Sequence, residues 1–249
     1  YLVRADPEAD ALTLSAAPVP AGAVFTDARD GTATFAWTPT LAGSHTVTFS
    51  ASDGALSDAE TIVISVGPVD APPLLRGGRV ILRTPDMNDH EAWVALRIAS
   101  RDFLAPWEPL WPANDMTRSS FRNRIKQYLR DIADDAAYPF FIFSSDERTL
   151  MGALTLSNVR RGVAQMATLG YWIGAPFARQ GYMTAAVRAM LPFAFDHLSL
   201  HRVEAACLPS NQASVALLRR CGFEQEGLAR SYLKINGEWR DHLLFARLR

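Results

Sequence analysis

Residues 170–186 decide the fold, and their sequence is GYWIGAPFARQGYMTAA. The segment begins as a strand, passes through a short loop of small and basic residues, and enters a helix near residue 181. Several backbone N–H groups and the positive end of a helix dipole then point to one place, where a pyrophosphate fits. Arg179 adds positive charge, and Gly181 allows close approach to the phosphates. A strand-to-helix loop that binds no phosphate would look similar, so the segment needs support from its surroundings.

That support comes from a second helix downstream, in residues 209–223, PSNQASVALLRRCGF. Ser210 or Asn211 would cap its start, and Gly222 would end it. The surrounding periodicity predicts helices at 88–99, 121–132 and 181–197. It predicts strands at 80–82, 138–143, 150–156, 166–173, 202–207, 223–229 and 239–247. This alternation is typical of a mixed α/β layer.

A pyrophosphate loop, a strand and an Asn-led helix that ends in Gly222-Phe223 together resemble the GNAT family of N-acetyltransferases. The resemblance covers residues 76–249 and is strongest to the RimJ-like branch, the ribosomal-protein-alanine N-acetyltransferases. The segments that carry it are SRDFLAPWEP at 100–109, RQGYMT at 179–184, HRVEA at 201–205 and SYLKINGEWRDH at 231–242. It implies a GNAT fold in which a neutral amine attacks acetyl-CoA directly.

The resemblance also implies where acetyl-CoA binds. Pantetheine would lie along the 166–174 strand, one of whose N–H groups would stabilise the oxyanion, and the pyrophosphate would sit on the loop amides. Ala178 replaces the family's first basic or Gln position, and Met183 replaces its second Gly, which implies weaker affinity rather than none. No metal is expected. The implied cofactor residues are Tyr171, Trp172, Ile173, Arg179, Gln180, Gly181, Tyr182, Met183, Thr184 and Asn211.

Two carboxylates are candidates for removing the proton from the amine. Glu204 lies on the strand before the Asn-led helix, and Glu108 lies in a Pro-Trp-Glu-Pro loop. Each also has a structural interpretation, Glu108 as a loop brace and Glu204 as a surface residue, and a water chain could relay the proton instead. Leu218 stands where some relatives carry a Tyr general acid. Tyr232 is a further candidate donor to the leaving thiolate.

The N-terminal part has a different pattern. Residues 9–67 alternate with period 2, with strands predicted at 11–14, 32–37, 45–51 and 61–66, and resemble bacterial Ig-like or cadherin-like repeats in GTATFAWTP (31–39), AGSHTVTF (42–49) and SDGALSD (52–58). VDAPP at 69–73 resembles the joint between such repeats, and Pro72-Pro73 with Gly77-Gly78 predicts a linker. We therefore expect two domains, a small all-β Ig-like sandwich at 1–73 and a GNAT domain at 74–249.

Composition and charge agree with two modules. Hydrophobic residues make up 49% and charged residues 20% of the chain, which argues against bulk disorder. Residues 1–75 hold nine acidic and two basic residues, whereas the remainder holds 17 acidic and 23 basic ones. A mildly positive second half suits an anionic ligand. No apolar run approaches the roughly 20 residues of a membrane-spanning helix.

Three functions are compatible with these features. The first is acetylation of a protein N-terminal α-amine, with a ribosomal protein as the implied acceptor and no direct nucleic-acid contact. The second is acetylation of a small amine such as an antibiotic or polyamine. The third is a surface or adhesive protein with a degenerate acetyltransferase scaffold. Trp107 and Trp111 either wall the acceptor site or pack in the core. The cofactor predicts a cytoplasmic location, whereas the Ig-like repeat suggests an extracellular one.

Overall fold

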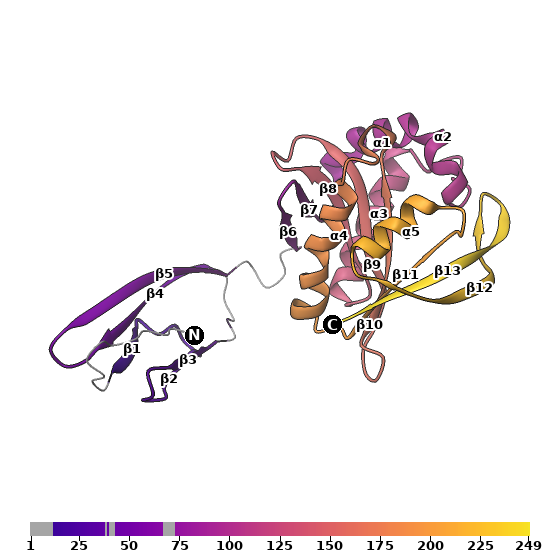
Figure 1. Cartoon of the computed structure of the whole chain (residues 1–249). Helices are drawn as coiled ribbons and strands as arrows, with labels where there is room; N and C mark the ends of the chain where they lie inside the picture. Colours follow the sequence, from indigo (N-terminus) through magenta and orange to yellow (C-terminus); the bar gives the residue numbers. More distant parts are fainter. Residues whose placement is uncertain (1–11, 38, 40–42, 67–72) are drawn as a thin grey trace. The chain divides into compact units, whose positions relative to one another are not determined.

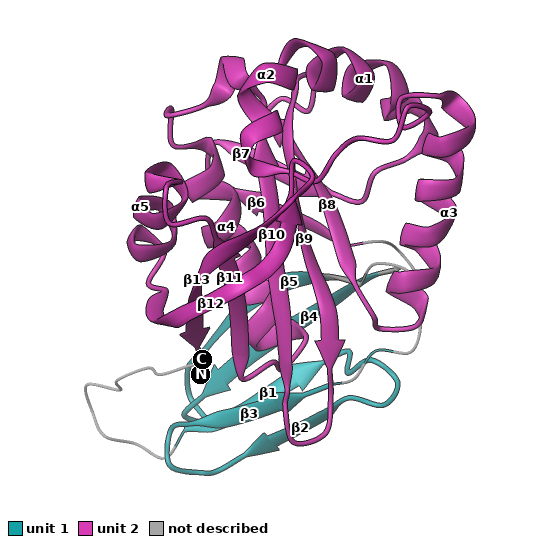
Figure 2. Cartoon of the chain, turned by 90° about the vertical axis from the view of Figure 1, so that its right-hand side faces the viewer, with its two compact units in different colours: residues 1–71 teal, residues 72–249 magenta. Residues whose placement is uncertain are grey.

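The computed structural model describes residues 12–37, 39, 43–66 and 73–249. Tertiary contacts divide the chain into two compact units, residues 1–71 and 72–249 (Figure 2). The predicted inter-repeat joint at 69–73 lies outside the described residues except for Pro73.

Unit 1 contains two small antiparallel sheets (Figure 1). One sheet has the order β1 (Thr13–Ala17), β4 (Gly43–Ser52), β5 (Ser57–Val66), and the other pairs β2 (Val24–Asp27) with β3 (Ala33–Ala36). The strand β2 was not predicted, because four residues with two apolar positions give little period-2 signal.

The two sheets of unit 1 meet through aromatic rings. The rings of Phe25 and Phe35 lie 6.1 and 5.5 Å from that of Phe49, between ring centroids. The N–H of Leu14 donates to the Asp27 carboxylate at 3.0 Å, which ties the first sheet to the second. These contacts make unit 1 an all-β module with a small aromatic core.

Unit 2 is built on one eight-stranded sheet of order β12-β13-β11-β10-β9-β8-β7-β6. Every neighbouring pair is antiparallel except β10 with β11, which run parallel. The strands are β6 (Leu74–Gly77), β7 (Val80–Arg83), β8 (Tyr138–Ser144), β9 (Leu150–Arg160), β10 (Met166–Ile173), β11 (Arg202–Cys207), β12 (Glu224–Ile235) and β13 (Glu238–Leu248).

Helices cover both faces of this sheet (Figure 1). On one face, residues of α4 and α5 pack against β7–β11 and β13 in the larger core. On the other, residues of α1 and α3 pack against β8 and β9 in a smaller core. The helices are α1 (His90–Ala99), α2 (Arg101–Leu104), α3 (Arg118–Ala133), α4 (Tyr182–Pro192) and α5 (Gln212–Arg220), with 3-10 turns at Met87–Asp89, Ala105–Trp107 and Ala175–Phe177.

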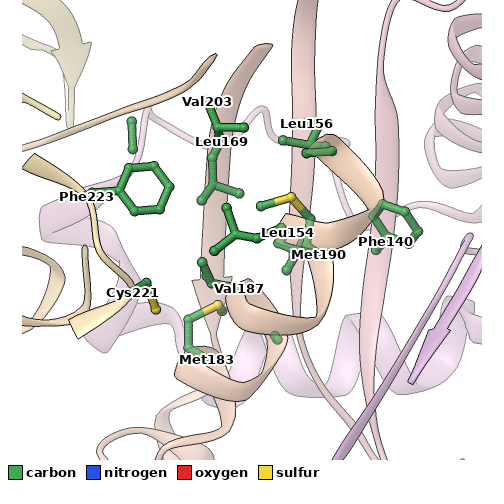
Figure 3. Close-up of a cluster of buried hydrophobic side chains, with 14 of the residues drawn as sticks. Phe140, Leu154, Leu156, Leu169, Met183, Val187, Met190, Val203, Cys221 and Phe223 are labelled. Atoms are coloured by element: carbon green, nitrogen blue, oxygen red, sulfur yellow. The ribbon is translucent and has the colours of Figure 1, made fainter. Parts of the chain in front are cut away.

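The larger core holds α4 against the sheet. Its buried side chains include Leu154 and Leu169 from the sheet and Val187 and Met190 from α4 (Figure 3). The predicted single helix at 181–197 is in fact α4 followed by a π-helical turn at Phe193–His197. A long apolar surface of α4 therefore fixes its N-terminus, where the predicted phosphate site begins.

The prediction of a linker through Gly78 is wrong at residues 74–77, which form the edge strand β6. Gly77 serves close packing rather than flexibility, because a Cβ there would lie 2.5 Å from Cβ of Ala189 on α4. No helix among the described residues has the length and apolar character needed to cross a membrane.

Candidate active site

The central strands β10 and β11 diverge partway along the sheet. They pair only from Met166 with Arg202 to Thr168 with Glu204, although β10 continues to Ile173 beside β9. Beyond Thr168, the edge of β10 that faces β11 therefore has no strand partner. Such an edge offers backbone groups to an extended ligand.

The alternation of a strand identifies which amides face this gap. The N–H of Gly174 donates to the Met151 carbonyl of β9 at 2.8 Å. Because successive N–H groups point to opposite sides, the Trp172 amide also faces β9, whereas those of Tyr171 and Ile173 face the gap. A Cβ at Gly170 would meet no atom within 4 Å, so the sheet surface is open at this level.

The predicted phosphate loop joins β10 to α4. Arg179 and Gly181 adopt positive φ angles of 61° and 84°, and no side chain caps the start of α4. Within the described part of the chain, no carbonyl or side chain accepts from the N–H groups of residues 179–184. These free donors at a helix N-terminus fit an anionic pyrophosphate.

The side chains of this loop contribute unequally. Met183 is buried in the larger core, so only its backbone is available (Figure 3). Arg79, which the sequence analysis did not single out, donates to the Gln180 carbonyl at 3.0 Å, and its guanidinium lies 4.5 Å from the Tyr182 ring centroid. A basic group separated by 101 positions from its partner in the chain carries no local signal of this role.

The C-terminus of α1 holds the start of the loop. The Ser100 hydroxyl accepts the N–H of Ala175 at 2.9 Å, and Ser100 is almost fully buried. Leu96 fills the space beside Gly174, where a Cβ would lie 2.4 Å from its Cδ1 atom. The loop is thus anchored from a helix far away in the sequence.

At the start of α5, the side chains connect to β10. The side-chain oxygen of Asn211 (Oδ1) accepts the Ser214 N–H at 3.1 Å, which makes Asn211 the helix cap. The hydroxyls of Ser214 and Tyr171 are hydrogen-bonded at 2.6 Å across the diverging strands. Burial raises the pKa of Tyr171, so its hydroxyl stays protonated at neutral pH. Ser214 was not predicted, because nothing in the sequence places it beside Tyr171.

On the opposite face of the sheet, Glu108 forms a buried ion pair with Arg97. The guanidinium donates to both carboxylate oxygens at 2.8 and 2.7 Å, and the Trp111 indole N–H donates to one of them at 2.8 Å. The Arg97 guanidinium also lies 4.0 and 4.8 Å from the ring centroids of Trp111 and Trp172. Glu108 thus braces Arg97, while Trp107 is half-buried in the same loop.

Glu204 lies elsewhere on this face, at the last paired position of β10 and β11. Its carboxylate accepts from Arg202 at 2.7 Å, and Arg202 also pairs with Glu226. The structure therefore does not bring the two predicted carboxylates, Glu204 and Glu108, together. Leu218, at the position of the absent acid, is fully buried in the larger core.

The tip of the β12–β13 hairpin contacts the loop that contains Glu108. The Asn236 N–H donates to the Glu108 carbonyl at 2.9 Å, and a Cβ at Gly237 would lie 3.4 Å from Leu110. These contacts join the hairpin tip to the loop that contains Glu108 and Leu110. A separate cavity of about 780 Å³ lies between β6 and α4, lined by Leu74 and Arg188 among others, and contains none of the predicted site residues.

The comparisons with known proteins agree with this geometry. The family described as an acetyltransferase (GNAT) domain matches residues 79–224. The chain is 35% identical over 175 residues to the probable N-acetyltransferase YjcK of Bacillus subtilis, covering 70% of this chain and 97% of that protein. It is also 35% identical over 173 residues to the [ribosomal protein uS5]-alanine N-acetyltransferase of Escherichia coli, covering 68% and 87%.

Solved structures show the same likeness. Mycobacterium smegmatis RimJ in complex with CoA-disulfide matches with a TM-score of 0.66 and 35% identity, covering 71% of this chain and 86% of that one. The ribosomal-protein-S5-alanine acetyltransferase of Vibrio fischeri matches with a TM-score of 0.66 and 28% identity, covering 71% and 96%. The chain therefore belongs to the GNAT family of acetyltransferases. It is an N-acetyltransferase that uses acetyl-CoA, and the free amides of its loop fit that cosubstrate.

Proposed function

We propose that this enzyme acetylates the N-terminal α-amine of a protein, and that a ribosomal protein is its acceptor. The observation that carries the proposal is the 35% identity to an enzyme named for the alanine of ribosomal protein uS5, across 87% of that enzyme. The N-acetyltransferase activity itself does not depend on this choice of acceptor.

The proposed cofactor site follows the free backbone donors. The pyrophosphate accepts from the amides of residues 179–184, with Arg79 and Arg179 beside it, and pantetheine lies along the free edge of β10. The acetyl oxygen then accepts from the N–H of Tyr171 or Ile173 as negative charge develops on it. Asn211 contributes by holding the start of α5.

Two side chains from the sequence analysis are proposed proton acceptors. Glu204 is partly exposed but paired with Arg202, and both oxygens of Glu108 accept from Arg97. Replacing a true base with Gln lowers kcat by about 10²–10⁴-fold. On the leaving-group side, the hydroxyl pair of Tyr171 and Ser214 is the proposed source of the proton for the thiolate.

A thiol-release assay with acetyl-CoA tests the acceptor. We expect release with a peptide that begins with a free alanine, and none with the same peptide already acetylated at its N-terminus. Spermine and an aminoglycoside serve as small-molecule comparisons. Release with these amines and not with the peptide would establish the small-amine alternative, whereas no release with any acceptor would favour a degenerate scaffold.

We further propose that unit 1 is an Ig-like module and that the protein works in the cytoplasm. The facing sheets of unit 1 and their Phe25–Phe49–Phe35 contacts support the first proposal. The need for acetyl-CoA supports the second. Far-UV circular dichroism of residues 1–73 is expected to show strand without helix, and fractionation of the producing cells tests the location.

A further inference from the structure

His242 lies on the face of the sheet that carries the Arg97–Glu108 pair. Its neighbours on β13, Leu243 and Phe245, pack into the core beneath α4 and α5. Because side chains alternate along a strand, His242 faces the opposite side, together with Glu204 of β11. The residue is 3% exposed. In a histidine as buried as this, both ring nitrogens usually have a hydrogen-bond partner.

The register places His242 at the height of the predicted oxyanion site. Thr168, Glu204 and Ala246 are paired side by side across β10, β11 and β13. His242 is four residues from Ala246 along β13, and Trp172 is four residues from Thr168 along β10. Both therefore lie roughly 13 Å farther along the sheet than Glu204. The strand β11 and its pairing with β13 end at Cys207, one residue before this height, so no residue of β11 lies between His242 and β10 at this level.

The hydrogen bonding of His242 leaves one nitrogen free. Its Nδ1 lies 3.0 Å from the Arg240 carbonyl oxygen, which can only accept, so Nδ1 carries the proton. The neutral ring then bears its lone pair on Nε2. Nε2 has no hydrogen-bond partner among the described residues. It is also not fully enclosed, so a small part of its surface remains accessible. This tautomer is that of a base ready to accept a proton.

We propose that His242 is the base that prepares the acceptor amine, an inference that rests on the proposed function. Nε2 takes one proton from the acceptor ammonium, and the freed lone pair attacks the acetyl carbonyl carbon. As the C–N bond forms and the C–S bond breaks, the Tyr171–Ser214 hydroxyl pair protonates the thiolate to the CoA thiol, and the second proton of the nitrogen replaces the proton that the hydroxyl pair has given up. His242 returns its proton to water, so protons and charge balance over the cycle.

The charged groups around the ring are already paired. Tyr232 of β12 contacts it with 5.8 Å between ring centroids. On β13, the exposed Arg240 pairs with Glu238, and Asp241 accepts from the Ser231 N–H. The remaining charges on this face are the Arg202–Glu204 pair of β11 and the Arg97–Glu108 pair beside α1. Asp241 has a backbone donor and each of the other charged groups has a counter-charge, and imidazole is a side chain suited to exchange protons near neutral pH.

The two carboxylates are less suited to this role. Glu204 lies roughly 13 Å lower on the sheet, by the strand rise, and its carboxylate faces Arg202. Both oxygens of Glu108 accept from the buried Arg97. A base needs a free lone pair within reach of the amine, and His242 Nε2 has one.

The variant His242→Asn gives the sharpest test. The Asn amide can still donate to the Arg240 carbonyl, but it offers no base. With the alanine peptide, we expect kcat to fall by about 10²–10⁴-fold at neutral pH, with an unchanged KM for acetyl-CoA. The loss should shrink as pH rises, because more of the amine is then neutral. A merely structural residue would show neither this split nor this pH profile.

A control variant, a competing variant and a rescue complete the experiment. The control His201→Ala removes an exposed histidine that the proposed site does not include, and it is expected to lower kcat by less than about tenfold. The variant Glu204→Gln tests the competing base: a loss of about 10²–10⁴-fold in this variant, with His242→Asn nearly unchanged, would overturn the role of His242. Added imidazole should restore part of the turnover of His242→Ala. Thermal unfolding of every variant separates loss of base from loss of fold.

The outcomes separate the two proposals. A wild-type protein that binds acetyl-CoA but acetylates no peptide refutes the proposed acceptor, and the inference fails with it. If the wild type acetylates the peptide and the folded His242→Asn variant has the same kcat, the role of His242 is refuted and the proposed acceptor is not. If the variants unfold, NMR of the wild type decides: peptide binding should protonate the His242 ring, and an unchanged ring resonance overturns the role.

Discussion

The two sides of the active site are built in different ways. The proposed phosphate side consists of consecutive residues, 174–184, and offers backbone amides. The proposed acceptor side combines α1, the loop after α2, β10 and the β12–β13 hairpin, and is lined by side chains such as Arg97, Glu108 and His242. A backbone site tolerates changes in side-chain identity, whereas a side-chain site depends on each partner.

The difference between a backbone site and a side-chain site determines how departures from the family pattern should affect binding. The resemblance to the family implies that Ala178 and Met183 depart from its loop pattern, yet the amides of residues 179–184 have no acceptor among the described residues. On the acceptor side, the replacement of a single group would leave a buried charge or donor without its partner. We therefore expect substitutions to act through backbone geometry on one side and through partner loss on the other.

The largest effect is expected for Gly181→Glu. Its carboxylate would enter the anion site, and its φ of 84° would strain any side chain. Affinity for acetyl-CoA should fall by at least about a thousandfold, which corresponds to about 4 kcal/mol. Isothermal titration calorimetry measures it. Gly162→Glu is the matched control, because Gly162 has a φ of 63° with open space around it and lies outside the loop. Unchanged affinity in Gly181→Glu would remove the cofactor from this loop.

The next effect concerns the buried ion pair. Glu108→Gln would leave the Arg97 guanidinium without its counter-charge, so the free energy of unfolding should fall by about 3–5 kcal/mol. Urea denaturation measures it. Glu238→Gln breaks the exposed pair with Arg240 and is expected to cost less than about 1 kcal/mol. If the Glu108→Gln protein is stable but its kcat is strongly reduced, Glu108 acts as the catalytic base rather than as a structural partner of Arg97.

A smaller effect is expected across the diverging strands. Ser214→Ala would leave the buried Tyr171 hydroxyl without its partner, which costs about 1–3 kcal/mol of stability. Adding Tyr171→Phe removes the orphaned hydroxyl, so the double variant should regain part of this loss. The four proteins of this cycle are compared by thermal unfolding. Strict additivity of the two single effects would show that the hydroxyls do not interact.

The smallest effect is expected from removal of unit 1. Residues 72–249 contain both cores of the acetyltransferase unit and all of its site residues. Expressed alone, they should fold and bind acetyl-CoA as the full chain does, because a unit with its own core folds independently. Calorimetry of the truncated and full proteins makes the comparison. Loss of acetyl-CoA binding in the truncated protein would show that unit 1 is required for the function of the acetyltransferase unit.

Much of the fold could be predicted from local patterns. The strands at 138–143, 150–156, 166–173 and 202–207 lie within a few residues of β8 to β11. The elements that were not predicted include the short strands β6 and β2, whose existence depends on a partner, and the four-residue helix α2. The strand β6 forms because Gly77 allows close packing on α4, which a reading of Gly77-Gly78 as a linker does not reveal.

The sequence by itself indicated the family and predicted the loop of consecutive amides at the start of α4, because such a loop is encoded in neighbouring residues. Tertiary structure alone decided which side chains accompany it. Arg79 reaches Gln180, Ser214 meets Tyr171, and His242 is brought to the level of Trp172 by strand register. These contacts join residues far apart in the chain, and only the packing and pairing of the sheet determine their separation in space.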